Sequence, residues 1–251
     1  MQSAAQKKFI SLLSKIDFSK RLYEVFYDFC TLGTYSLALP FYPDLAKEEL
    51  EKVYKRYTRD QLVLFDEAFT VMVNEMEITN EDFLGEVYQQ CEFGNARQGQ
   101  FFTPYHVSLM IAKVSLGDAK EKITERGFLT LNEPACGSGG MVIAFRQAML
   151  DEGCNPSRDV FVVAQDIGDT AFMMTYIQLS LYGMGAKVIH GNTLSLEIFR
   201  ELHTPNYFIT DWRLRLMLRN MSEFMREIDT PLPEKEEIIS QKKTSIQLDL
   251  F

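Results

Sequence analysis

Apolar residues recur at helical spacing through the first 95 positions of the chain. They fall on one face from Gln6 to Ile16, and the pattern continues from Phe18 to Leu39, where Gly33 predicts a break. A strongly amphipathic stretch spans Asp60 to Met76, and Asn80 is placed to cap a helix that runs on to Cys91. These patterns predict a helical N-terminal domain over residues 1–95.

From residue 96 to residue 229 short apolar runs alternate with helical patterns. The runs at 129–133, 160–163, 188–190 and 207–209 have the length and composition of buried strands. Strands that alternate with helices predict an α/β domain. Residues 230–251 are polar and rich in charge, which predicts a flexible tail.

A glycine-rich turn joins the first of these strands to a helix. Residues 133–140 read Glu-Pro-Ala-Cys-Gly-Ser-Gly-Gly. Glycines allow positive φ and the close approach of a ligand, and the free N–H groups of a helix start favour an anion, near which Ser138 could add a hydroxyl. Doubly wound sheets bind nucleotide-like ligands at such a turn. The alternative is a glycine-rich corner that binds nothing.

The string 133–140 resembles the first motif of the DNA adenine N6-methyltransferases. It is most similar to the modification subunits of type I restriction systems, which have Asp-Pro-Ala-Cys-Gly-Ser-Gly-Gly. Gly-Gln-Phe-Phe-Thr-Pro at 99–104 looks like the family's Phe-Thr-Pro motif, and Asp-Phe-Leu-Gly-Glu-Val-Tyr at 82–88 resembles the helix before it. The resemblance covers about residues 80–195 and implies a truncated Rossmann-like class I methyltransferase domain that uses S-adenosylmethionine in DNA methylation and restriction-modification.

The resemblance also implies which residues hold S-adenosylmethionine. They are Phe102, Thr103, Pro104, Glu133, Ala135, Gly137, Ser138, Gly139, Asp166, Ile167 and Asn192. Thr103 and Pro104 could instead serve only as the N-cap and first position of a helix. Asp166 ends the second strand, where a carboxylate suits ribose hydroxyls, and it could also cap the helix from Thr170. The family has Asp where this chain has Glu133 and Asn192.

The family's catalytic element is Asn/Asp-Pro-Pro-Tyr/Phe after the fourth strand, and this chain has no Pro-Pro pair. Asp211 and Trp212 follow the expected strand at 207–209, so they are the candidates for its acceptor and its base-stacking ring. Only about forty residues follow them, which leaves no room for the family's later strands and target-recognition region. We therefore expect impaired catalysis, or recognition of DNA through a partner subunit.

Charge and cysteine content limit the partners, metal sites and cellular compartment that we expect for the chain. The formal net charge is −9, so the chain lacks the basic surface of a protein that grips DNA alone, and its short basic clusters predict solvated helix faces. The four cysteines are scattered and only three histidines are present, which disfavours a zinc site and suits a reducing cytoplasm. No apolar run has membrane-spanning length. The adenine-methylase motifs disfavour a small-molecule methyltransferase.

The last five residues are Gln247, Leu248, Asp249, Leu250 and Phe251. They resemble the peptide by which bacterial replication and repair proteins bind the replicase sliding clamp, which implies clamp docking through the tail. A near copy at residues 61–65 lies in an amphipathic helix, so it is read as coincidence. The alternatives are a non-catalytic protein that docks on the clamp, and a tail that tucks its apolar end onto the body.

Overall fold

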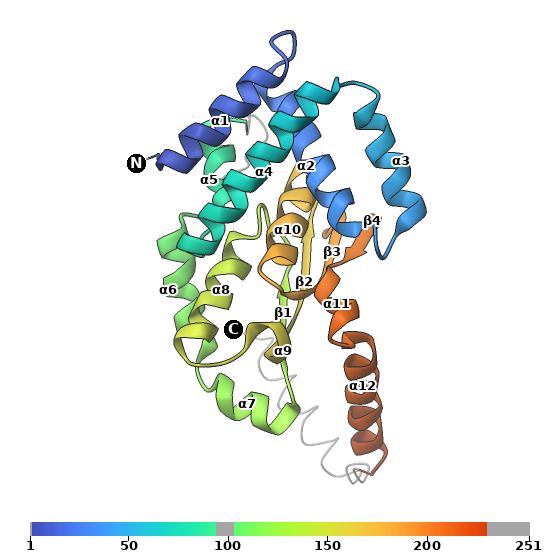
Figure 1. The fold of residues 1–251 in the computed structure, drawn as a ribbon. Coiled ribbons are helices and arrows are strands. Elements are labelled where there is room, and N and C mark those ends of the chain that lie inside the picture. Colours follow the sequence, from blue (N-terminus) through green and yellow to red (C-terminus); the bar gives the residue numbers. More distant parts are fainter. Residues whose placement is uncertain (1, 94–102, 230–251) are drawn as a thin grey trace, which may run out of the picture. The chain divides into compact units, whose positions relative to one another are not determined.

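The computed structural model describes residues 2–93 and 103–229 (Figure 1). The chain divides into two compact units, Met1–Trp212 and Arg213–Phe251, and each is described by itself. The expected boundary near residue 95 stays a prediction about sequence organisation.

Five helices form the first part of the larger unit. They are α1 (Ala4–Ile16), α2 (Leu22–Ala38), α3 (Pro43–Tyr54), α4 (Arg59–Thr79) and α5 (Phe83–Gln90). Capping boxes begin α1 at Ser3 and α4 at Thr58. Asn80 was expected to start a helix, but it ends α4 in the left-handed conformation with φ 57°, and Asp82 caps α5 instead.

Helix α2 runs through Gly33 without the expected break. A Cβ at Gly33 would lie 2.9 Å from Cδ1 of Ile177 in a later helix. The glycine therefore marks a close approach between two helices, because the absent side chain lets them pack together.

The second part of this unit is a mixed α/β arrangement, as expected. Its helices are α6 (Tyr105–Leu116), α7 (Ala119–Arg126), α8 (Gly140–Asp151), α9 (Pro156–Asp159), α10 (Asp169–Leu181) and α11 (Pro205–Ile209). Its strands are β1 (Leu129–Glu133), β2 (Val160–Asp166), β3 (Gly185–Asn192) and β4 (Glu197–His203). They lie in the order β1-β2-β3-β4, parallel except for β4, which runs antiparallel to β3.

The sheet continues in one direction only. The chain passes from β1 to β2 to β3 through α8 and α10, and right-handed crossovers place both helices on the same face. In the part of the chain that the structure describes, β1 pairs with β2 alone. This is one half of a doubly wound sheet, whose second half would extend from β1.

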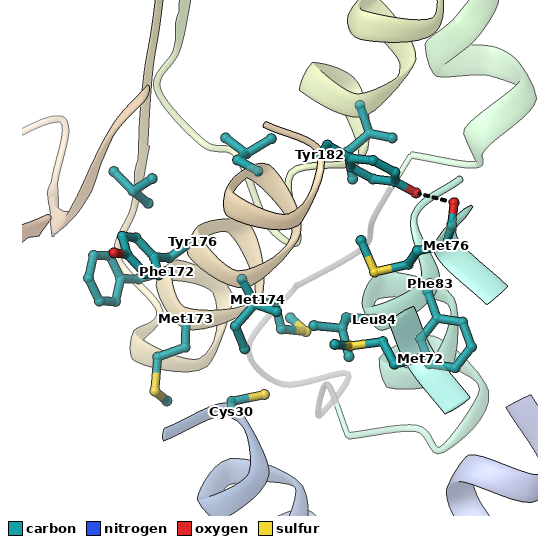
Figure 2. Close-up of a cluster of buried hydrophobic side chains, with 14 of the residues drawn as sticks. Cys30, Met72, Met76, Phe83, Leu84, Phe172, Met173, Met174, Tyr176 and Tyr182 are labelled. Carbon is teal, nitrogen blue, oxygen red and sulfur yellow. Dashed lines mark hydrogen bonds between the residues drawn. The ribbon is translucent and has the colours of Figure 1, made fainter. Parts of the chain in front are cut away.

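Helix α10 joins the sheet to the N-terminal helices. Its residues from Thr170 to Leu179 are all buried, so it packs on every side. Figure 2 shows Met173 and Met174 of α10, Cys30 of α2 and Leu84 of α5 in one cluster of buried side chains. The core therefore runs without interruption from the helical part into the α/β part.

The expected strand at 207–209 is wrong, because residues 205–209 form helix α11. Pro205 occupies its first turn, where a missing N–H costs nothing. The fourth strand lies earlier, at Glu197–His203. In the smaller unit the described element is helix α12 (Trp212–Asp229), whose first residue belongs to the larger unit. None of the helices described is both long and apolar enough to span a membrane.

Candidate functional site

Three polar side chains end the three parallel strands. Glu133 is the last residue of β1, Asp166 of β2 and Asn192 of β3. Glu133 pairs with Ala164, and Asp166 pairs with His190, so each strand extends two residues beyond the one before it. The structure thus places three of the expected site residues at one carboxyl edge, where doubly wound sheets bind ligands.

The glycine turn has the expected backbone. Gly137 and Gly139 have φ 56° and 91°, a region that only glycine enters at little cost. The Gly139 N–H donates to the Cys136 carbonyl over 2.8 Å, and α8 begins at the next residue. Ala135 before the turn is exposed. The turn therefore brings backbone and the start of a helix to the carboxyl edge.

The Asp166 carboxylate joins two loops of this edge. Its Oδ2 accepts from the Gly137 N–H and its Oδ1 from the Gly168 N–H, both over 2.8 Å. It makes no cap bond within α10, whose N-cap is Gly168. Each carboxylate oxygen can accept more than one hydrogen bond, so these contacts leave capacity for ligand hydroxyls. Ile167 beside it is 60% exposed, which offers an apolar surface next to the carboxylate.

Asn192 serves the loop after β3. Its Oδ1 accepts from the backbone N–H groups of Leu194 and Ser195, over 2.9 and 3.3 Å. The Thr193 hydroxyl donates to the Pro134 carbonyl over 2.6 Å. The end of β3 is therefore tied to the glycine turn, and the Asn192 amide oxygen shapes its own loop as an Asx-turn.

The hydroxyl of Ser138 points into the protein rather than toward the carboxyl edge. Ser138 is buried, and its hydroxyl donates to Oδ2 of Asp82. Oδ1 of Asp82 accepts from the Gly85 N–H over 2.9 Å and from the Gln178 amide over 2.8 Å. The expectation that this hydroxyl faces a ligand is wrong, because the buried carboxylate already takes it.

Asp82 thereby joins the two sequence strings 82–88 and 133–140. Burial raises the pKa of Asp82, and the hydrogen bonds from Ser138, Gln178 and Gly85 oppose that rise. A Cβ at Gly85 would lie 2.1 Å from Oδ2 of Asp82, and one at Gly140 would lie 2.7 Å from it. Both glycines are therefore needed for close packing around the carboxylate.

Two residues of α10, Thr175 and Gln178, donate hydrogen bonds to the backbone of the glycine turn, and the sequence analysis did not select them. The Gln178 amide also donates to the Ser138 carbonyl over 2.8 Å, and the Thr175 hydroxyl donates to the Gly137 carbonyl over 2.9 Å. They lie three positions apart, on one face of a buried helix. The sequence could have indicated them, because they are two polar residues three positions apart within the mostly apolar stretch 171–179.

A hollow of about 400 Å³ lies beside Ile167. Its lining residues are Tyr23, Tyr27, Tyr88, Ile167, Gly168, Asp169, Thr170 and Ala171. The Tyr27 hydroxyl donates to Asp169 over 2.5 Å. Burial raises the pKa of Tyr27 and raises that of Tyr88 to about 12, so both of these phenols stay neutral. Aromatic rings from the helical part thus reach the loop after β2.

The Phe-Thr-Pro string is described only in part. Phe102 lies outside the described residues, and Thr103 and Pro104 are exposed, irregular residues before α6. Helix α6 begins at Tyr105 with no side-chain cap, so the expected capping by Thr103 is wrong. Residues 247–251 also lie outside the described part of the chain.

Asp211 and Trp212 do not lie at the carboxyl edge. Trp212 is fully buried, and its ring packs on Phe128 and Phe161 with centroids 5.0 and 5.4 Å apart. A Cβ at Gly185 would lie 2.0 Å from its Nε1. These three partners precede or begin β1, β2 and β3, so Trp212 lies at the amino edge of the sheet. The candidate catalytic pair therefore does not share an edge with the other predicted site residues, and the fixed, buried ring of Trp212 is not available to stack on a base.

Two similar solved structures are a protein described as a candidate class I S-adenosylmethionine-dependent methyltransferase from Listeria monocytogenes and a type I restriction-modification methyltransferase subunit from Streptococcus thermophilus. Sequence identities are 15% and 14%, and TM-scores are 0.42 and 0.34. The matches cover 72% of this chain but 51% and 55% of the others, so the chain spans about half their length.

No curated protein matches the chain. The model of the N-6 DNA methylase family matches residues 79–213, a range that holds the glycine turn, Asp82 and all three strand-end residues. Because this match covers more than half of the 251 residues, the chain belongs to the N-6 DNA methylase family.

Proposed function

We propose that the chain binds S-adenosylmethionine at the carboxyl edge of β1, β2 and β3. The observation that carries the proposal is the Asp166 carboxylate, which is held between the Gly137 and Gly168 amides at the end of the second strand. A carboxylate so fixed has acceptor capacity for the two ribose hydroxyls. The exposed Ile167 next to it suits one face of an adenine ring.

The backbone groups at the carboxyl edge also suit S-adenosylmethionine. Backbone at Gly137 and Gly139 has no side chain in the way, and α8 begins without a side-chain cap, so the N–H groups of its first turn suit a carboxylate. When bound, S-adenosylmethionine would supply an electrophilic methyl group. The chain's own contribution would be to orient it, with Asp166 on the ribose and the turn on the amino-acid end.

Isothermal titration calorimetry of the intact chain with S-adenosylmethionine and S-adenosylhomocysteine tests the proposal. Asp166→Ala should weaken binding at least about tenfold, the scale of one or two lost hydrogen bonds to a charged acceptor. Asp151→Ala is the matched control, since Asp151 is an exposed carboxylate that pairs with Lys113. A folded protein that binds neither compound at millimolar concentration contradicts the proposal, as does equal binding by the Asp166 variant.

We further propose that the chain alone transfers methyl groups to DNA adenine poorly. Support comes from the absence of a Pro-Pro pair in the sequence and from the burial of Trp212 at the opposite edge of the sheet. Transfer of tritiated methyl groups to mixed genomic DNA is the test, with the chain alone and with added cell extract. Strong incorporation by the purified chain overturns this part of the proposal and leaves cofactor binding untouched.

A second candidate function rests on the tail sequence alone. Residues 247–251 match the clamp-binding peptide at every position, and docking there would bring an acidic protein to DNA without a basic surface of its own. A peptide of residues 243–251 should bind a bacterial sliding clamp at micromolar strength, and Leu250→Ala with Phe251→Ala should abolish binding. Equal clamp binding by the intact chain and by that double variant would exclude the idea.

A further inference from the structure

Helix α12 carries an apolar stripe that is about half exposed to solvent. Its residues recur at intervals of three and four, the spacing of a helix that pairs with another helix. They are Leu214, Met217, Leu218, Met221, Phe224 and Met225, each between 49% and 61% exposed. Exposed stripes of this size mark interaction surfaces in water-soluble proteins.

We propose that the stripe is covered by α12 of a second copy of the chain, in antiparallel orientation. Charge along the helix selects this occupant. The first half of the sequence, 213–220, carries three arginines, whereas residues 221–229 carry one arginine and three acids, a net charge of −2. An antiparallel copy sets each basic half beside an acidic half, and a parallel copy sets like charges together.

The helix dipole points to the same arrangement. A lone helix is stabilised by acids in its first turn and bases in its last. Helix α12 has no acid in its first turn, and the sequence of its last four residues, 226–229, holds two acids and one arginine. Its charges therefore oppose its own dipole, and an antiparallel neighbour would offset both ends at once.

One flank of the stripe makes the prediction specific. Arg213 and Glu227 are fourteen residues apart in the sequence, a spacing of two heptads, so the heptad pattern assigns them equivalent positions beside the stripe. In an antiparallel pair Arg213 of one copy lies along the Glu227 end of the other. The exchange is symmetric, because a two-fold axis relates the copies.

The exposed area of the stripe indicates how strongly two copies of the chain should bind each other. The exposed parts of its six side chains amount to roughly 600 Å² per copy, or roughly 1,200 Å² for the pair, which is the lower limit for a specific interface. We therefore expect a dimer with a dissociation constant on the order of micromolar. Such a dimer would be present at tens of micromolar protein and absent far below that.

Sedimentation equilibrium of the full chain from about 1 to 200 μM tests the proposal. Wild type should shift from the 29.0 kDa monomer to a dimer, and Met221→Glu should stay monomeric. Arg213→Glu should weaken dimerisation at least about tenfold, and Arg213→Glu with Glu227→Arg should restore it. Arg158→Glu, at an exposed position outside α12, is the matched control and should dimerise normally.

Three results overturn the proposal. The first is a wild-type chain that stays monomeric over the whole range, which would leave the stripe to another partner or to the chain's own tail. The second is a dimer that Met221→Glu does not affect. The third is a charge exchange that fails to restore what Arg213→Glu removes, since an antiparallel pair requires restoration.

Discussion

Replacement of Asp82 by alanine should uncouple the helical part from the glycine turn. The carboxylate accepts hydrogen bonds from the Gly85 N–H, the Gln178 amide and the Ser138 hydroxyl, all within the protein. Each buried donor left without an acceptor costs about 1–3 kcal/mol. The burial that raises the pKa of Asp82 also means that removal of the carboxyl relieves a desolvation cost. We predict a net loss of about 2–4 kcal/mol in the free energy of unfolding.

Asparagine at this position separates hydrogen bonding from charge. Its amide oxygen can still accept from the Gly85 N–H and the Gln178 amide, and its NH₂ group can donate to the Ser138 oxygen. Asp82→Asn should therefore stay within about 1 kcal/mol of wild type at neutral pH. Because the pKa of Asp82 is raised in the folded protein, its contribution to stability is fully present below pH 3.8, the ordinary pKa of an aspartate, and falls as pH rises through the folded pKa. The stability of Asp82→Asn relative to wild type should rise over the same interval.

Urea unfolding followed by circular dichroism measures these differences, with Asp151→Ala as the exposed control. Gly85→Ala adds a further check, because its Cβ would lie 2.1 Å from Oδ2 of Asp82. It should destabilise the wild type strongly and the Asp82→Ala background less, because there only the Ser138 hydroxyl, 2.2 Å from the new Cβ, has to rotate away. An Asp82→Ala loss no larger than that of the control, or additive losses for the pair, would refute the reasoning.

The remaining predictions concern packing and pH. Trp212→Ala should cost about 3–5 kcal/mol, measured by thermal unfolding, because it empties a fully buried site against Phe128; a loss below about 1 kcal/mol would show that the ring is not core. Burial lowers the pKa of His203 below 6.5, so its contribution to stability should be complete above pH 6.5 and diminish as pH falls below it. Urea titrations at several pH values should show this pH dependence of the free energy of unfolding, and His203→Gln should remove it. Gly33→Leu should destabilise far more than Gly33→Ala, since Cδ1 of Ile177 can yield to one methyl group but not to a larger side chain; equal losses would contradict the close approach.

Local patterns predicted the helices and the carboxyl edge well. The amphipathic faces of residues 6–16 and 60–76 fold as α1 and α4, since a stripe of apolar residues has few other ways to be buried. Asp166 ends its strand as expected, and Asn192, which was expected two residues after the run at 188–190, ends the longer strand β3. The sequence thus predicted residues that lie at the carboxyl edge, and their role toward a ligand stays a prediction.

What the sequence did not predict depends on tertiary contacts. Residues 207–209 are as apolar as a strand, but Pro205 begins a helix there, and β4 is a half-exposed strand with weak apolar character. The position of Trp212 follows from that change, because the antiparallel strand β4 returns the chain to the amino edge before α11 begins. Gln178 gains its role only when α10 lies under the glycine turn. Such pairings join positions far apart in sequence, and no local pattern encodes them.

The most direct test of the central claim is a methyl spectrum of the chain labelled with ¹³C at isoleucine δ1 groups, recorded during titration with S-adenosylhomocysteine. Ile167 at the carboxyl edge is 60% exposed, and Ile209 in α11 is 72% exposed, so both methyl groups report on solvent-facing surfaces. Substitution of each by valine assigns its signal. Our account predicts a saturable shift of the Ile167 signal with no change at Ile209. A shift at Ile209 with none at Ile167, or no shift at either in the folded protein, would contradict it.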